Sequence, residues 1–139
     1  MIKIIIIFYT LFRTLPVEQK SFTISKSYVL GIRIGIIYFV LFSLWGGYVA
    51  QQPGHTVGAK DGGSGLAFID WSTLFGDLRI AHFFGMHSLQ LIPIFAIFCA
   101  THLKENKAIR LIWLFSIIYF VFVMFVLIQA LIGKPFIAI

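Results

Sequence analysis

The chain has 139 residues, of which 60% are hydrophobic and only 12% are charged. Soluble domains carry about a quarter charged residues, so this composition excludes a soluble globular protein and indicates an integral membrane protein. The net charge of +6 does not indicate nucleic-acid binding, because most basic residues flank apolar segments. The single cysteine, Cys99, excludes an intrachain disulfide and a CxxC metal or redox motif.

The first apolar stretch, at residues 2–15, is too short to cross a bilayer between Lys3 and Arg13. A transmembrane helix needs about 20 apolar residues, so we expect an interfacial helix or an incomplete span here. Three later segments are long enough and predict transmembrane helices at residues 31–50, 78–101 and 111–132. The predicted fold class is therefore all-α, a polytopic membrane helical bundle forming one domain over residues 1–139.

A long glycine-rich segment, residues 51–77, joins the first two predicted spans. Loops of this length are usually either functional or disordered. This one contains apolar residues, among them Leu66, Phe68 and Trp71, which a disordered segment would not need. We therefore predict an ordered loop that folds back over the ends of the helices.

Basic residues are concentrated before the first span and between the second and third spans. The long loop has one, Lys60, against three aspartates. The positive-inside rule places the basic segments in the cytoplasm. The N-terminus is then cytoplasmic, and the long loop and the C-terminus face outward.

The beginning of the second span, "GDLRIAHFFGMHSLQLIPIF", is unusually polar for a membrane segment. At about 100° per residue, five of its side chains fall within an arc of about 140° on one helix face: Arg79, His82, Met86, His87 and Gln90. An arginine facing lipid costs about a few kcal/mol, so this face should meet the protein interior, a water-filled cavity or a bound group. Arg79 and His82 also fit plain helix anchors near the boundary, whereas His87 and Gln90 lie deeper and favour a functional site.

Two polar residues outside this helix fall on the same side of the membrane. Gln129, near the end of the third span, either bonds to the polar face of the second span or lies at the interface. His55, in the long loop, is placed to fold over the site.

Haem b is the first cofactor that this pattern predicts, because it needs one or two neutral imidazole ligands and an apolar slot between helices. His87 or His82 would be the axial ligand, and Arg79 would meet a propionate. The two histidines point about 140° apart, so they cannot bind one iron from opposite faces. A copper or zinc site using His55, His82, Met86 and His87 is the second option, since imidazole and thioether suit such metals. A quinone or lipid headgroup site is the third.

Three motifs carry a family resemblance: the loop segment "GHTVGAKDGGSGLAFIDWS", the helix pattern GDLRxAHFxGxHxLQ and the C-terminal pattern QALxGxP. Over roughly residues 46–136 they resemble a family of uncharacterised bacterial integral membrane proteins. The resemblance implies a bacterial inner-membrane protein but no activity. It implies that nine residues belong to the family pattern: His55, Asp61, Trp71, Asp77, Arg79, His82, His87, Gln90 and Gln129.

The layout is also similar to half of a haem A synthase, in which a glycine-rich outer segment leads into a haem-binding helix. There the helix histidine is normally followed by arginine, whereas His87 is followed by Ser88, and an outer cysteine pair is absent here. This resemblance therefore implies haem binding rather than haem A synthesis.

The leading hypothesis is a membrane protein whose His, Arg and Gln site binds haem b or a related redox cofactor in electron transport. The alternative is a non-catalytic small subunit whose polar face packs against partner helices. No catalytic arrangement is recognisable, so the sequence does not decide whether the protein is an enzyme. Three helices bury little by themselves, so we expect a homo-oligomer or other membrane subunits. Four glycines offer surfaces for close helix packing: Gly31, Gly35, Gly46 and Gly47.

Overall fold

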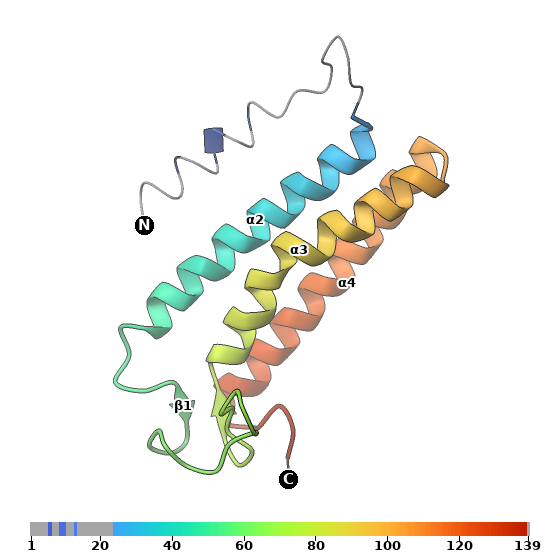
Figure 1. Cartoon of the computed structure of the whole chain (residues 1–139). Coiled ribbons are helices and arrows are strands. Elements are labelled where there is room, and N and C mark those ends of the chain that lie inside the picture. The colour runs from blue at the N-terminus through green and yellow to red at the C-terminus, as the bar shows by residue number, and fades with distance from the viewer. Residues whose placement is uncertain (1–5, 7–8, 11–12, 14–23, 139) are drawn as a thin grey trace. The chain divides into compact units, whose positions relative to one another are not determined.

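The computed structural model of the protein describes residues 6, 9–10, 13 and 24–138. Its main elements are three long helices (Figure 1): α2 (Lys26–Val49), α3 (Arg79–His102) and α4 (Glu105–Leu131). Each is long and apolar enough to cross a membrane, which confirms the predicted all-α membrane fold by length and composition. The apolar segment expected at residues 2–15 lies mostly outside the described residues.

Two of the helices begin earlier than the apolar runs that predicted them. α2 begins at Lys26 rather than at residue 31, because Ser25 caps it: the Ser25 hydroxyl accepts a hydrogen bond of 3.2 Å from the Tyr28 backbone N–H. α4 begins at Glu105 rather than at residue 111, so its first turn is polar. Hydropathy marks the part of a helix that suits lipid, whereas capping decides where the helix begins.

The chain divides into two compact units, each containing part of all three helices. The first unit comprises residues 1–40 and 87–119. In it, small residues bring α2 and α3 together, since a side chain at Gly31 would overlap Ala96. Gly35 faces the Ser88 carbonyl and the ring of Pro93, the proline inside α3. The Ser88 hydroxyl also donates to the Gly35 carbonyl at 3.3 Å.

The second unit comprises residues 41–86 and 120–139 and contains the long loop. Its core is a cluster of Trp71, Ile80 and Val126, with Leu66, Phe84 and Phe136 packed against it. Trp71 therefore fastens the loop onto both α3 and the end of α4. A side chain at Gly76 would overlap the backbone of Ala130, so this glycine permits close contact between the loop and α4.

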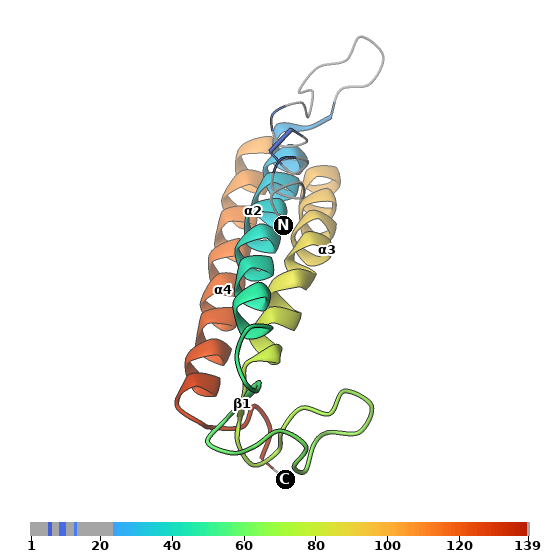
Figure 2. The same ribbon diagram turned by 90° about the vertical axis from the view of Figure 1, so that its left-hand side faces the viewer.

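The long loop, which Figure 2 shows in side view, contains two short strands that the sequence did not predict. β1 (Thr56–Val57) pairs antiparallel with β2 (Gly76–Asp77), with Thr56 opposite Asp77 and Val57 opposite Gly76. The Leu78 backbone N–H also donates to the His55 carbonyl at 3.0 Å. This pairing brings the beginning of the loop to the first residue of α3.

Candidate functional site

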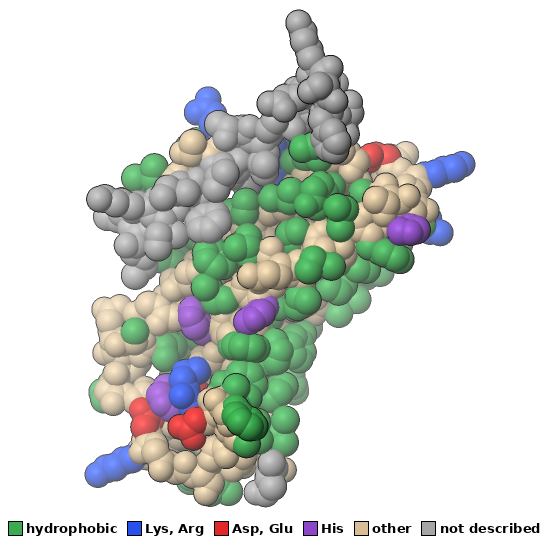
Figure 3. Space-filling model, in the orientation of Figure 1, with side chains coloured by type: hydrophobic (Ala, Val, Ile, Leu, Met, Phe, Trp, Pro, Cys, Tyr) green, Lys and Arg blue, Asp and Glu red, His purple; other side chains and the backbone are tan. Residues whose placement is uncertain are grey.

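A cavity of about 370 Å³ lies in the second unit, where α2, the loop and α3 meet. Its polar lining comes from Gln52, His55, Asp61, Arg79 and His82. Figure 3 shows Asp, Arg and His side chains gathered beside the loop, with hydrophobic side chains around them. A few polar groups in an otherwise apolar cavity are typical of small-molecule sites.

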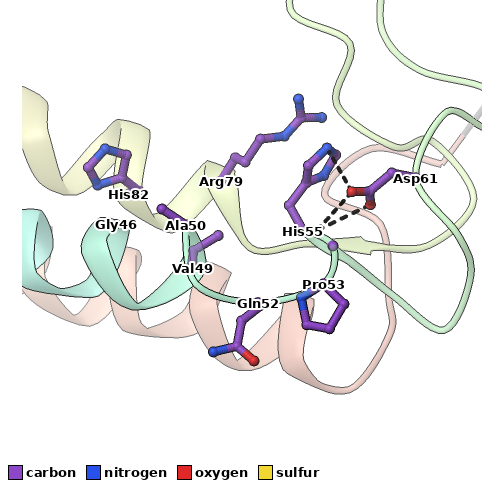
Figure 4. Close-up of a pocket in the computed structure, with 10 residues that line it drawn as sticks. Gly46, Val49, Ala50, Gln52, Pro53, His55, Asp61, Arg79 and His82 are labelled. Carbon is purple, nitrogen blue, oxygen red and sulfur yellow. Dashed lines mark hydrogen bonds and ion pairs between the residues drawn. The ribbon is translucent and has the colours of Figure 1, made fainter.

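His82 is held in one orientation by a carbonyl group of α2. Its Nδ1 lies 2.8 Å from the Phe42 carbonyl oxygen, which can only accept a hydrogen bond. Nδ1 therefore carries the proton, and in the neutral imidazole Nε2 holds the lone pair. The ring fits beside α2 because position 46 is glycine, as Figure 4 shows: a Cβ there would overlap the ring.

Asp77 and Arg79 form a buried ion pair at the beginning of α3. The Asp77 side chain is fully buried, and its Oδ2 lies 2.7 Å from Arg79 Nη2. Asp77 Oδ1 accepts 3.0 Å hydrogen bonds from the Arg79 backbone N–H and from Nε. Arg79 Nη2 also donates to the Asp70 carbonyl. The carboxylate thus caps the helix and fixes the guanidinium, which is one-third exposed, beside the cavity.

His55, which also lines the cavity, lies between two carboxylates. Its Nε2 is 3.5 Å from Asp61 Oδ2, and its Nδ1 is 3.6 Å from Asp77 Oδ1. Asp61 also accepts backbone hydrogen bonds from His55, at 3.1 Å, and from Thr56, at 2.9 Å. Burial alone would raise the pKa of Asp61, but the hydrogen bonds from Thr56 and His55 and the His55 charge outweigh it and lower the pKa.

The structure brings together three of the seven predicted site residues, namely His55, Arg79 and His82, around this cavity. The sulfur of Met86 instead accepts a 3.1 Å hydrogen bond from the Ser43 hydroxyl. The Gln129 amide donates to the Pro135 carbonyl at 2.6 Å, so it fastens the C-terminal segment rather than bonding to α3.

His87 and Gln90, the two deepest residues of the predicted polar face, do not line the cavity. Both are exposed, and both belong to the first unit. A helical wheel gives the direction of a side chain around its own helix, but not which neighbouring segment covers that direction. The loop covers only the first turns of α3, so the residues nearest its beginning meet the cavity.

Three residues that contribute to the site were not predicted as site residues from the sequence. Asp77 was named only as part of the family pattern, and the sequence did not indicate its burial against Arg79 and His55. Asp61 was likewise named only as part of the family pattern, and the sequence did not indicate its contact with His55. Gly46 looked like a helix-packing residue, and its role as space for the His82 ring depends on a contact distant in sequence.

The described part of the chain has no group of side chains that could bind a metal ion directly. There, no group of three His, Cys, Asp or Glu side chains is placed to hold a metal. What the cavity offers is one imidazole lone pair at His82, a guanidinium at Arg79, and an imidazole–carboxylate pair at His55 and Asp61.

In comparisons with protein-family models, curated proteins and solved structures, nothing matches this chain. The functional argument therefore depends on the chemistry of the site. The two resemblances inferred from sequence motifs stay predictions.

Proposed function

We propose that this integral membrane protein binds haem b or a related redox cofactor in the cavity at the beginning of α3, with His82 as the axial ligand. The observation that carries the proposal is the hydrogen bond from His82 Nδ1 to the Phe42 carbonyl. Metal-ligating histidines almost always donate their second ring nitrogen in this way, which fixes the ring and makes the ligand nitrogen more basic.

The number of available ligands favours haem over a bare ion. A haem brings its own four nitrogen ligands, so a single histidine suffices to hold its iron. A copper or zinc site needs several side chains, and no such group exists among the described residues. When bound, haem supplies one-electron redox chemistry.

The residues around His82 fit the two halves of such a ligand. Val49, Ala50 and Pro53 provide an apolar wall, and Gly46 leaves room beside the imidazole. Arg79, one-third exposed at the mouth, is placed to meet a carboxylate. His82 would hold the iron, and Arg79 would orient the acidic edge.

A second candidate ligand, a quinol, is favoured by the volume of the cavity. About 370 Å³ is near the lower end of the range for ligand pockets and suits a single-ring headgroup. The Nε2 lone pair of His82 would accept a hydrogen bond from a quinol hydroxyl. The apolar wall would then contact the beginning of the isoprenoid tail.

An absorption titration of the purified protein with haemin tests the proposal. We expect a Soret band in the wild type, its loss in His82→Ala, and its weakening in Gly46→Leu, which displaces the His82 ring. His87→Ala is the matched control and should keep the band, because His87 does not line the cavity.

Three other results would change the proposal; the last two are read from the quinone content and the co-purifying proteins of the same preparation. A band lost in His87→Ala and kept in His82→Ala would transfer the ligand role to His87. A colourless wild type that retains a quinone through extraction, dependent on His82, would favour the quinol site. A wild type that binds neither and co-purifies with other membrane proteins would favour the non-catalytic subunit.

We also propose that the chain lies in a bacterial inner membrane with its N-terminus in the cytoplasm, in a homo-oligomer or with other membrane subunits. The basic residues of the turn after α3 and of the first residues of α4 support the orientation: Lys104, Lys107 and Arg110. The glycines first considered for helix packing partly serve contacts within the chain, since Gly31, Gly35 and Gly46 all face α3. Association, if mediated by helices, would therefore use other surfaces.

A further inference from the structure

An uncharged apolar tip projects from the long loop. It consists of residues 66–69, with sequence LAFI, and Figure 2 shows the loop extending sideways from the ends of the helices in its own unit. The Phe68 side chain is fully exposed, at 107%, and Ile69 is 44% exposed. No other part of the described structure covers the Phe68 side chain, so its surroundings must come from outside the chain.

The base of this tip is held firmly by backbone hydrogen bonds. The Leu66 N–H donates to the Trp71 carbonyl and the Asp70 N–H donates to the Leu66 carbonyl, both at 2.8 Å. Gly65 and Ser72 form a β-bridge below them. Arg79 adds a bond to the Asp70 carbonyl, so the tip is fastened to the beginning of α3.

The backbone of the tip is also strained in a way that presents Phe68 outward. Phe68 has a φ of 70° and Asp70 a φ of 51°. Both lie in the left-handed region of backbone conformation, which residues other than glycine rarely adopt. Such conformations persist only where the surrounding structure imposes them, and they concentrate at functional sites. Here the residue in this conformation is the fully exposed Phe68.

The position of the tip along α3 identifies its surroundings. Trp71, at its base, packs edge-on against Phe83 with ring centres 5.1 Å apart and lies 6.0 Å from Phe84. Phe83 is the fifth residue of α3, so Trp71 lies beside the helix at about 6 Å from its beginning, at 1.5 Å per residue. Phe83 is itself 40% exposed on α3, which is long and apolar enough to cross a membrane. The base of the tip therefore lies beside an exposed aromatic side chain of α3, which would face lipid in a membrane.

We propose that residues 66–69 insert Phe68 and Ile69 into the interfacial layer of the membrane leaflet that surrounds the beginning of α3. Apolar and aromatic side chains partition to this layer, and interfacial segments bury themselves about 5–10 Å into it. The tip holds the loop against the lipid surface. A partner protein is the competing occupant, but the position beside the exposed Phe83 favours lipid.

Site-directed spin labelling in phospholipid vesicles that contain only this protein tests the proposal. A Cys99→Ser background removes the single cysteine, and Phe68→Cys and, separately, Ile69→Cys introduce the label. Gly63→Cys is the matched control, because Gly63 is exposed in the same loop and nothing lies within 4 Å of a Cβ there. The measurement compares relaxation of each label by oxygen, which concentrates in lipid, with relaxation by a water-soluble nickel chelate.

We expect labels at residues 68 and 69 to respond more to oxygen than to nickel, and the label at residue 63 to show the reverse. Phe68 loses no packing when replaced, since its side chain is fully exposed, whereas Ile69 is partly covered. Agreement between the two positions guards against a local distortion in one variant. Nickel accessibility at both tip positions equal to that at residue 63 would overturn the proposal and leave the tip as a docking site for a protein.

Discussion

At the scale of single residues, the beginning of α3 holds structural contacts and the proposed ligand-binding residue in two neighbouring turns. Asp77 and Arg79 stabilise the helix end and the loop, whereas His82, one turn further, lines the cavity and leaves Nε2 outside its bond to the Phe42 carbonyl. Arg79 donates through Nε and Nη2 to Asp77, and through Nη2 to the Asp70 carbonyl. Removing Arg79 should therefore affect folding as well as the proposed ligand binding. Removing His82 should affect mainly binding, with a smaller effect on folding from the lost hydrogen bond to the Phe42 carbonyl.

Arg79→Gln should lower the free energy of unfolding substantially, because it leaves the fully buried Asp77 carboxylate without its cation. Breaking a buried pair costs about 3–5 kcal/mol, and the partial exposure of Arg79 reduces our expectation to about 2–3 kcal/mol. Denaturant unfolding in detergent micelles measures the change. Lys60→Gln, which removes an exposed cation from the same loop, should change the stability little.

The double variant Asp77→Asn, Arg79→Gln provides the control for this interpretation. If the cost of Arg79→Gln comes from an unpaired buried charge, removing that charge should restore part of the stability. Costs that simply add in the double variant would show that the two side chains act independently, against the contact at 2.7 Å.

At the scale of elements, the contact between α2 and α3 depends on small residues more than on apolar side chains. In the first unit, Gly31 faces Ala96, and in the second, Gly46 faces His82 and Gly85 faces Phe42. Between helices in lipid, close backbone approach and van der Waals packing replace the hydrophobic effect as the source of attraction. A methyl group added at one of these glycines should therefore lower the stability of the protein.

Gly31→Ala should destabilise the protein by about 1–3 kcal/mol, the usual cost of overpacking, because the new Cβ would overlap that of Ala96. Ala96→Gly in the same chain should recover much of this loss by returning the space. Thermal unfolding of the two single variants and the double variant measures the coupling. Equal stabilities of Gly31→Ala and the wild type would contradict this close contact.

The helices were predictable from the sequence, and the arrangement inside the loop was not. Apolar runs such as residues 111–132 exceed the span of a bilayer, so composition alone identifies a membrane helix. The pairing of β1 with β2 depends on a glycine, Gly76, that fits against Ala130, a contact that no local pattern reveals. For the same reason the polar face of α3 was predicted as one group, although only its first residues, Arg79 and His82, meet the cavity.

At the scale of the whole molecule, the order of elements and the distribution of charge together predict the topology. If all three helices cross the membrane, the loop before α3 and the turn between α3 and α4 lie on opposite sides. The turn and the first residues of α4 contain Lys104, Lys107 and Arg110, whereas the loop has one basic residue, Lys60. The positive-inside rule then places the turn in the cytoplasm and the cavity at the outer face.

Cysteine labelling in intact cells tests this topology, using the Cys99→Ser background. A membrane-impermeant maleimide should label Lys60→Cys from outside, and should label Lys107→Cys only after the membrane is permeabilised. Both positions are exposed, so equal labelling after permeabilisation serves as the control for reactivity. The reverse pattern would mean that the cavity faces the cytoplasm. Labelling of both positions in intact cells would mean that α3 does not cross, because a single crossing must separate its two ends.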